Sequence, residues 1–238
     1  MSLTKKPDGS YPAPAPPDER ERLRALQELE VLDTMPERAF EDIVFLASYI
    51  CRTPIALISL VDADRQWFKA RIGLDVAETS RDLAFCAHAI LEPERVLQVA
   101  DAARDERFAT NPLVTGDPFI RFYAGAPLVT PDGRAIGTLC TIDRVPRELD
   151  ADQTRALQAL SREVVAQLEL RRTVLALERA LAEPGEARLA RGGDREDPAR
   201  RARELVTRLD DSGAVVEERM RGLLARMQQL QKRTGNAP

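Results

Sequence analysis

The feature that most constrains the fold of this chain is the apolar run PIALISLVD at residues 54–62. The run is continuous and rich in β-branched residues, which is typical of a central strand buried on both faces. Residues 65–73, RQWFKARIG, follow after two intervening residues and are predicted to form its hairpin partner. Further strands are predicted at residues 95–101, 120–130 and 134–143, and a Pro-Asp-Gly sequence between the last two favours a turn.

Helical patterns flank this run of strands. Leucines recur every three residues within residues 18–32, and residues 34–51 carry a second apolar face at helical spacing. For the second helix, Thr34 is a candidate cap and Pro36 suits the first turn. A third helical pattern covers residues 152–181. Helices before and after five strands predict an α+β fold with an antiparallel sheet.

The length of 238 residues suits one domain with additional segments at both ends. Residues 1–17 are rich in proline and alanine and are predicted to form an extended, mobile and disordered arm. The domain and its flanking helices are expected at residues 18–182. Proline and glycines interrupt the helical pattern at residues 183–198, which are predicted to be a linker, and a helical tail is expected at residues 199–238.

Composition excludes several classes of protein. The net charge of −4 argues against a general nucleic-acid binder, which needs a basic surface to meet phosphate. We find no apolar run long enough for a membrane span and no apolar segment of a signal peptide at the N-terminus. Three scattered cysteines are too few for a disulfide framework. We therefore expect a cytoplasmic protein that contacts neither nucleic acid nor membrane.

The segment FCAHAI holds the only histidine of the chain, His88, two residues after Cys86. Apolar residues at helical spacing predict a helix over residues 80–90, with Ser80 as a candidate cap. Two helical residues at this spacing are rotated by roughly 200° from each other, so the two side chains should point apart. Structural zinc usually takes four Cys or His ligands. We therefore expect no metal site here, and we expect Cys86 to be a buried thiol.

Two further segments hold candidate binding residues. Phe108 is apolar within a polar segment, and Asn111 begins an Asn-Pro turn shortly after it. In the strand predicted at residues 120–130, Phe122 and Tyr123 should point to opposite faces. Small residues beside them leave room near the backbone, as the floor of a pocket requires, so either aromatic ring is a candidate pocket wall.

The chain resembles a GAF domain over about residues 20–172. The resemblance rests on six segments that occur in this order: LDTMPERAFEDIVFLA, PIALISLVDADRQWFKARIGLD, FCAHAI, DERFATNPLV, IRFYAGAPL and GTLCTIDRVPREL. The resemblance is strongest to the GAF domains of bacterial histidine kinases and cyclase-type signalling proteins. The resemblance implies a sheet of five or six antiparallel strands, with terminal helices on one face. It also implies a small-molecule pocket on the other face, roofed by short helices and loops.

This resemblance makes seven residues the candidates for ligand binding. They are Cys86, His88, Phe108, Asn111, Phe122, Tyr123 and Cys140. GAF domains bind varied ligands, including cyclic nucleotides, bilins, haem and small metabolites, so the cofactor stays unassigned. Bilin-binding relatives carry a cysteine directly beside a histidine, whereas one residue separates the two here.

The expected function is that of a sensory module without catalytic activity of its own. A bound small molecule would shift the arrangement of the terminal helices and so signal to a downstream protein. One alternative is a thiol-redox enzyme of the methionine sulfoxide reductase type, in which Cys86 and Cys140 would be the attacking and resolving thiols. Another alternative is a dimerisation module that binds no ligand.

The tail carries a heptad pattern. Steps of three and four residues separate the following positions, of which all but the glycine are apolar: Val206, Leu209, Gly213, Val216, Met220, Leu223, Met227 and Leu230. Such a repeat is typical of a coiled coil. Because GAF relatives commonly associate through terminal helices, a homodimer joined by this tail is expected. The alternative is a helix that folds back on its own domain.

Overall fold

The computed structural model describes residues 6–7 and 10–182. The helices are α1 (Glu19–Glu28), α2 (Arg38–Cys51), the short 3₁₀ helix η1 (Arg81–Leu83), α3 (Phe85–Ala89), α4 (Pro112–Thr115) and α5 (Ala151–Ala182). The strands are β1 (Ile55–Val61), β2 (Arg65–Ile72), β3 (Glu78–Ser80), β4 (Leu97–Val99), β5 (Phe122–Val129) and β6 (Ala135–Asp143). The compact unit that carries the site ends at Arg172, and the described chain continues from there as the last part of α5.

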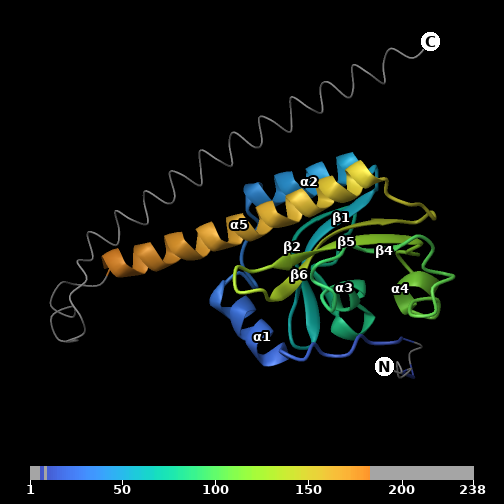
Figure 1. Cartoon of the computed structure of the whole chain (residues 1–238), viewed down its shortest axis with the longest axis horizontal. Helices are drawn as coiled ribbons and strands as arrows, with labels where there is room; N and C mark the ends of the chain where they lie inside the picture. Colours follow the sequence, from blue (N-terminus) through green and yellow to red (C-terminus); the bar gives the residue numbers. More distant parts are fainter. Residues whose placement is uncertain (1–5, 8–9, 183–238) are drawn as a thin grey trace, which may run out of the picture. The chain divides into compact units, whose positions relative to one another are not determined.

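The strands form one antiparallel sheet in the order β3-β2-β1-β6-β5-β4 (Figure 1). This architecture confirms the α+β prediction and all five predicted strands. Strand β3 was not predicted, because its sequence Glu-Thr-Ser has no apolar residue to mark a strand. The two central strands, β1 and β6, are buried along their whole length, as the apolar run at residues 54–62 indicated.

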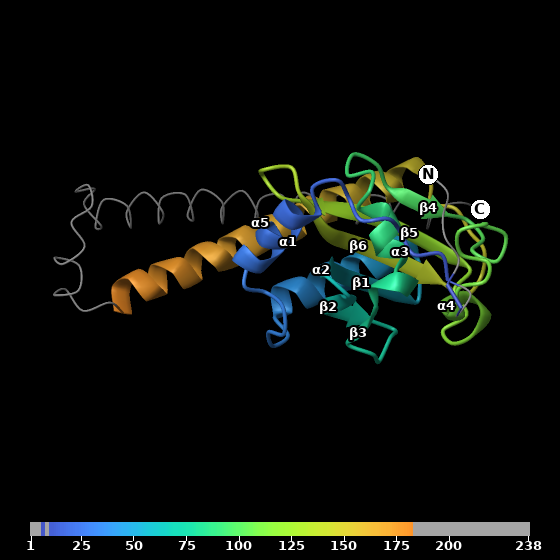
Figure 2. The same ribbon diagram turned by 90° about the horizontal axis from the view of Figure 1, so that it is seen from below.

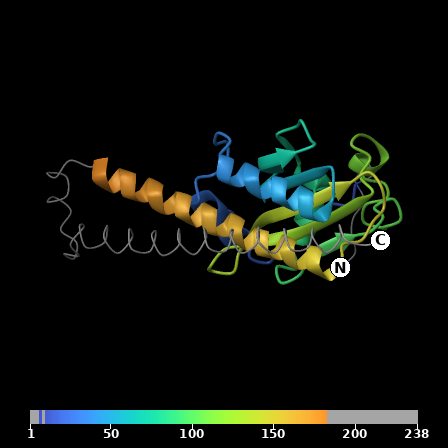
Figure 3. The same cartoon turned by 90° about the horizontal axis from the view of Figure 1, so that it is seen from above.

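Helices cover both faces of the sheet and enclose two separate cores. Helices α2 and α5 lie side by side on one face, whereas α3 lies on the other (Figures 1 and 3). The first core joins α1, α2 and α5 to the sheet through residues that include Leu26, Phe40, Leu60, Phe122, Leu139 and Leu160. The second core lies beneath α3 and includes Leu57, Phe85, Cys86, Phe108, Tyr123 and Cys140.

Helix α2 begins later than predicted, so Thr34 is not its cap. The helix starts at Arg38, and its N-cap residue is Glu37. The Thr34 hydroxyl donates to the carbonyl oxygen of Val31 at 2.6 Å and accepts from the buried Lys69 ammonium at 2.8 Å. Thr34 therefore provides a hydrogen-bond acceptor for the buried ammonium group of Lys69 instead of capping a helix.

The helix predicted at residues 80–90 is divided in two. The Ser80 hydroxyl accepts from the backbone N–H of Asp82, so Ser80 caps η1 as predicted. Ala84 then adopts an extended conformation, with φ −76° and ψ 116°, and separates η1 from α3. The separation leaves α3 as a single short turn of helix that lies over the sheet.

Residues 10–17 differ from the mobile arm that their composition predicts. Ser10 is completely buried, and Ala13 packs against the second core. His88 Nε2 donates to the carbonyl oxygen of Tyr11 at 3.0 Å. Figure 2 shows this segment running alongside α3. Contacts distant in sequence therefore hold a segment that has no secondary structure of its own.

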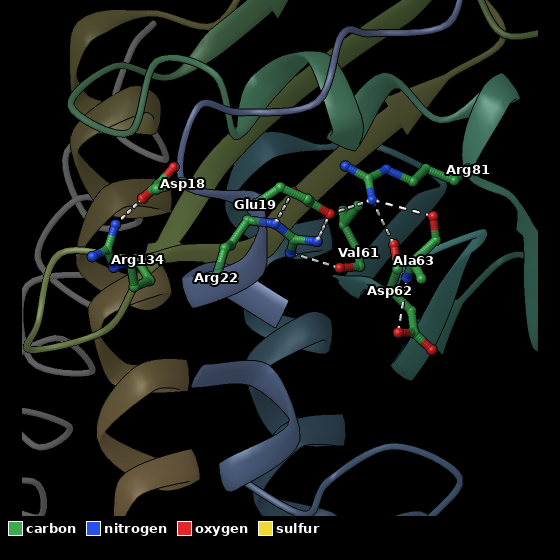
Figure 4. A network of polar contacts seen from close by, with 8 residues as sticks. All are labelled: Asp18, Glu19, Arg22, Val61, Asp62, Ala63, Arg81 and Arg134. Atoms are coloured by element: carbon green, nitrogen blue, oxygen red, sulfur yellow. Dashed lines mark hydrogen bonds and ion pairs between the residues drawn. The ribbon is translucent and has the colours of Figure 1, made fainter. Parts of the chain in front are cut away.

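A network of ionic contacts joins α1 to the β1–β2 hairpin (Figure 4). Arg22 is 1% exposed, and its Nη1 donates to the carbonyl oxygen of Val61 at 2.6 Å. Glu19 accepts from Arg22 Nε at 2.8 Å and from Arg81 Nη1 at 2.5 Å. The sequence pattern did not reveal this network, because a charged residue on an amphipathic helix normally faces solvent.

Two predictions lie outside the described residues: the linker at residues 183–198 and the helical tail at residues 199–238. Within the part of the chain that the structure describes, no helix is both long enough and apolar enough to cross a membrane.

Candidate functional site

A cavity of about 130 Å³ lies between the sheet and the segments that roof its α3 face. Its apolar lining consists of Ile55, Leu57, Phe68, Leu74, Val76, Phe85, Leu113, Pro118, Ile120 and Ile142, together with the faces of Cys86 and Tyr123. Gln66, Thr79 and Asp117 are the polar residues of the lining. The cavity is thus an apolar compartment with very few polar groups.

The alternation of side chains along the strands builds the floor beneath α3, of which Leu57 and Tyr123 line the cavity, whereas Cys140, Thr138 and Gly125 lie outside its lining. Leu57 on β1 and Cys140 on β6 are register partners, and Gly125 on β5 is paired with Cys140 on its other side. Side chains two residues apart on a strand share a face, which adds Thr138 to Cys140 and Tyr123 to Gly125. Helix α3 supplies the roof above this floor.

The polar groups of the lining mostly bind one another. Gln66 Nε2 donates to the Thr79 hydroxyl at 2.6 Å, and Gln66 Oε1 accepts from the Ser59 hydroxyl at 3.2 Å. A ligand would therefore meet mainly hydrocarbon, aromatic rings and sulfur. Such a lining favours a compact apolar molecule over a charged one.

Two thiols meet where α3 crosses β6. The Sγ atoms of Cys86 and Cys140 are 4.0 Å apart, and both residues are buried. The Thr138 hydroxyl donates to Cys86 Sγ at 3.1 Å, and the Tyr123 hydroxyl donates to the same sulfur at 3.4 Å. Residues that are 54 positions apart in sequence thus form one sulfur and hydroxyl cluster beside the cavity.

The cluster gives its two cysteines different acidities. Burial alone would raise the pKa of Cys86, but hydrogen bonds that include those from Cys140, Thr138 and Tyr123 outweigh burial and lower it. The neighbouring Cys86 and burial both raise the pKa of Cys140. Cys86 is therefore the thiol that ionises first, and Cys140 stays protonated beside it.

A glycine makes room for the Tyr123 hydroxyl. A Cβ atom at Gly125 would lie 2.1 Å from the Tyr123 oxygen and 2.7 Å from Cζ. The ring therefore folds over Gly125, which brings its hydroxyl to the sulfur of Cys86. A side chain at this position would displace the ring from the cluster.

His88 points away from the cavity and is not among the residues that line it. Besides its bond to Tyr11, the ring contacts Phe108 edge-on at 4.9 Å between centroids. Burial lowers the pKa of His88 to about 4, so the imidazole is neutral at pH 7. The helical rotation between Cys86 and His88 separates them as predicted, and His88 holds the N-terminal segment.

Phe108 and Asn111 support the roof without lining the cavity. The Phe108 ring stacks on Phe85 at 3.9 Å between centroids, with 10° between the planes. Asn111 Oδ1 accepts from the backbone N–H of Leu113 at 2.9 Å, and its Nδ2 donates to the carbonyl oxygen of Leu83 at 3.1 Å. Asn111 thereby caps α4 and joins it to η1.

Of the seven predicted site residues, the structure gathers Cys86, Tyr123 and Cys140 at the cavity wall and its sulfur cluster. Phe122 lies on the opposite face of β5, in the core beneath α2 and α5. Sequence reasoning missed Phe85 and Thr138, although Thr138 shares a strand face with Cys140 and could have been found by that spacing. Phe85 gave no such signal, because its contact with Phe108 depends on how the roof folds.

Comparison with known proteins places the chain among sensory domains. The family model of the GAF domain matches residues 35–168. A cyclic di-GMP phosphodiesterase from Pseudomonas aeruginosa is 47% identical over 161 residues, which are 67% of this chain and 27% of that protein. The chain therefore spans about a quarter of the length of this relative.

A solved structure shows the same fold at low sequence identity. The GAF domain of a phosphoenolpyruvate-protein phosphotransferase from Coxiella burnetii has a TM-score of 0.50 and 16% identity, covering 66% of this chain and 96% of that domain. The corresponding domain from Acinetobacter has a TM-score of 0.49 and 17% identity, with the same coverage of 66% and 96%.

The named relative corrects one expectation. From its sequence, the chain was expected to have no catalytic activity of its own, whereas the relative with 47% identity is named as an enzyme. The expectation was wrong because it relied on the absence of a recognised catalytic motif. A sensory domain and an enzymatic activity can belong to the same protein.

Proposed function

Because this chain belongs to the GAF domain family, we propose that it senses a compact apolar molecule taken up by the cavity beneath α3. The observation that carries this proposal is the cavity lining, in which aliphatic and aromatic side chains surround a space of about 130 Å³. Apolar cavities of about this size bind benzene-sized molecules. A haem, a bilin or a cyclic dinucleotide is far larger than this space.

We further propose that occupancy of the cavity controls the hydrolysis of cyclic di-GMP. Support for this step comes from the relative that is named as a cyclic di-GMP phosphodiesterase. Cyclic di-GMP itself does not fit the cavity, so the sensed molecule and the hydrolysed molecule are different. The proposal also places the protein in the cytoplasm, whose reducing conditions are consistent with the free cysteines of the described residues.

Benzene is expected to stabilise the folded protein by filling the cavity. A free concentration about ten times the dissociation constant adds about 1.4 kcal/mol. For a domain of this size, this increment raises the midpoint of thermal unfolding by about 3–6 °C. Differential scanning calorimetry of the full chain, with and without benzene, measures the shift.

The substitution Leu113→Trp should abolish this shift, because the larger side chain occupies the space that benzene would take. Leu97→Trp is the matched control, since Leu97 packs against the same core but does not line the cavity. An equal benzene shift in both variants would contradict uptake at this site.

In cells, the Leu113→Trp substitution should change the cyclic di-GMP concentration and the Leu97→Trp control should not. Identical cyclic di-GMP concentrations in cells with the two variants would refute the proposal that cavity occupancy controls cyclic di-GMP hydrolysis.

Dimerisation is the remaining part of the proposed function, and the heptad pattern of the tail supports it. The full chain is expected to be a homodimer with a dissociation constant below about 1 μM. Leu223→Asp should dissociate it, because a carboxylate in the apolar seam loses its hydration. Gln228→Asp, which lies outside the seam, should leave the dimer intact. Light scattering after size-exclusion chromatography measures the mass.

A chain that ends at Ala182 locates the dimer contact. If the tail holds the dimer together, this shortened chain is a monomer. An equally tight dimer in the shortened chain would move the contact to the helices of the domain, and a full-length monomer would refute the proposal.

A further inference from the structure

We propose that Cys86 and Cys140 form a dithiol that a small hydroperoxide oxidises to an intramolecular disulfide between α3 and β6. The site is the sulfur and hydroxyl cluster of Cys86, Cys140, Thr138 and Tyr123. Formation of this disulfide is distinct from ligand uptake, because the reacting atoms belong to the chain itself.

The positions of the two sulfur atoms permit this bond. Their separation of 4.0 Å must shorten to about 2.05 Å, so the sulfurs approach each other by about 2 Å. Cys140 lies on β6, which is held between β1 and β5 and cannot shift easily. Cys86 lies on α3, which has only five residues and follows the extended residue Ala84. The roof therefore moves toward the sheet when the bond forms.

The surroundings of Cys86 select it as the attacking thiol. The hydroxyls of Thr138 and Tyr123 both donate to its sulfur, which stabilises the thiolate. These bonds and the neighbouring Cys140 thiol keep the pKa of Cys86 below its usual range despite burial. The Cys140 thiol is then in place as the resolving group.

The reaction balances with one molecule of hydroperoxide. The Cys86 thiolate attacks the terminal oxygen, the O–O bond breaks, and the departing oxygen takes a proton to leave as water or an alcohol. Cys86 becomes a sulfenic acid. The Cys140 sulfur then attacks the sulfur of Cys86 and loses its proton, and hydroxide departs as water. Two thiols are oxidised by two electrons, and one peroxide bond is reduced.

The cavity decides which oxidant reaches the dithiol. Cys86 lines the cavity, whereas Cys86 and Cys140 are only 2% and 0% exposed to solvent. A small neutral hydroperoxide can enter a space of about 130 Å³, but a peptide disulfide cannot. Cys51 lies in the other core, and burial raises its pKa to about 11, so it should not react.

Bond formation would also change the cavity. The disulfide ties the roof to the floor at one wall of the compartment, so oxidation and ligand occupancy would influence each other. This consequence rests on the proposed uptake of an apolar molecule. The formation of the bond does not, since it requires only the two sulfurs and an oxidant.

Intact-mass spectrometry of the full chain tests the proposal. The reduced protein is treated with one equivalent of hydrogen peroxide, denatured, and alkylated without reductant. The chain should lose two hydrogen atoms, only Cys51 should be alkylated, and a peptide map should show a link between Cys86 and Cys140. A chain that gains oxygen atoms without a link, a link between two chains, or three free thiols would overturn the proposal.

Substitutions identify the role of each cysteine. Cys51→Ser is the matched control and should form the disulfide as the wild type does. Cys140→Ser should lose the disulfide entirely and accumulate a sulfenic acid on Cys86, which dimedone traps. If Cys140→Ser does not fold, the wild-type mass still decides. A disulfide in a chain that shows no benzene shift would leave this inference standing and refute ligand uptake alone.

Discussion

Replacing Arg22 by alanine is expected to lower the free energy of unfolding by about 3–5 kcal/mol, because the substitution breaks a buried ionic network. Arg22 is 1% exposed and bonds both the carbonyl oxygen of Val61 and the carboxylate of Glu19. Its loss leaves the Val61 carbonyl without this donor and removes one of the two cations beside Glu19. Urea denaturation followed by circular dichroism measures the change.

Arg24→Ala is the matched control, because it removes the same kind of side chain from the same helix. The Arg24 side chain is 80% exposed and pairs with Glu28 in the neighbouring turn. The expected change is within about 0.5 kcal/mol. Equal losses in the two variants would show that the Arg22 network does not stabilise the fold.

The pH dependence of the same variant provides a second readout. Burial would raise the pKa of Glu19, but hydrogen bonds from Arg22 and Arg81 outweigh it and lower the pKa from 4.5 to about 2. A lowered pKa in the folded state contributes stability above pH 4.5, and this contribution is lost as the pH falls toward 2. The difference in stability between wild type and Arg22→Ala should therefore shrink over this range. A constant difference would contradict the assignment to Glu19.

The substitution Gly137→Ala is expected to cost about 3 kcal/mol or more, because the added methyl group collides with the neighbouring backbone. A Cβ atom at Gly137 would lie 2.1 Å from the Ser59 carbonyl oxygen and 2.9 Å from the Cα atom of Leu60. Neither atom can rotate away, so β1 and β6 must separate. The shift would also move Thr138, and with it the hydroxyl that bonds Cys86.

Gly133→Ala provides the comparison for this effect. Gly133 has φ +83°, but nothing lies within 4 Å of an added Cβ atom. Strain in the backbone alone should cost about 1 kcal/mol. Thermal unfolding of both variants measures the difference, and a Gly137→Ala loss no larger than that of Gly133→Ala would refute the steric argument.

Local sequence patterns account for most of the fold. The apolar run at residues 54–62 has no polar face, so it must be buried on both sides, and it became the central strand β1. The Pro-Asp-Gly sequence likewise indicated a turn, and it joins β5 to β6 in an antiparallel hairpin. These predictions succeeded because period, β-branching and turn residues act over a few neighbouring positions. The prediction that Thr34 caps α2 was wrong, because the Thr34 hydroxyl accepts a hydrogen bond from Lys69, which is distant in sequence.

In the candidate site too, the sequence predicted the directions of side chains within one element but not the contacts between elements. Strand alternation by itself separated Tyr123 from Phe122, and helical rotation separated Cys86 from His88. The sequence could not show that the Cys86 thiol meets the Cys140 thiol, or that His88 binds the Tyr11 carbonyl. Those contacts depend on where α3 packs over the sheet, and the stacking of Phe85 on Phe108 is one of the contacts that hold α3 there. A period fixes the direction of a side chain within its own element, whereas its partner is chosen only when the elements pack together.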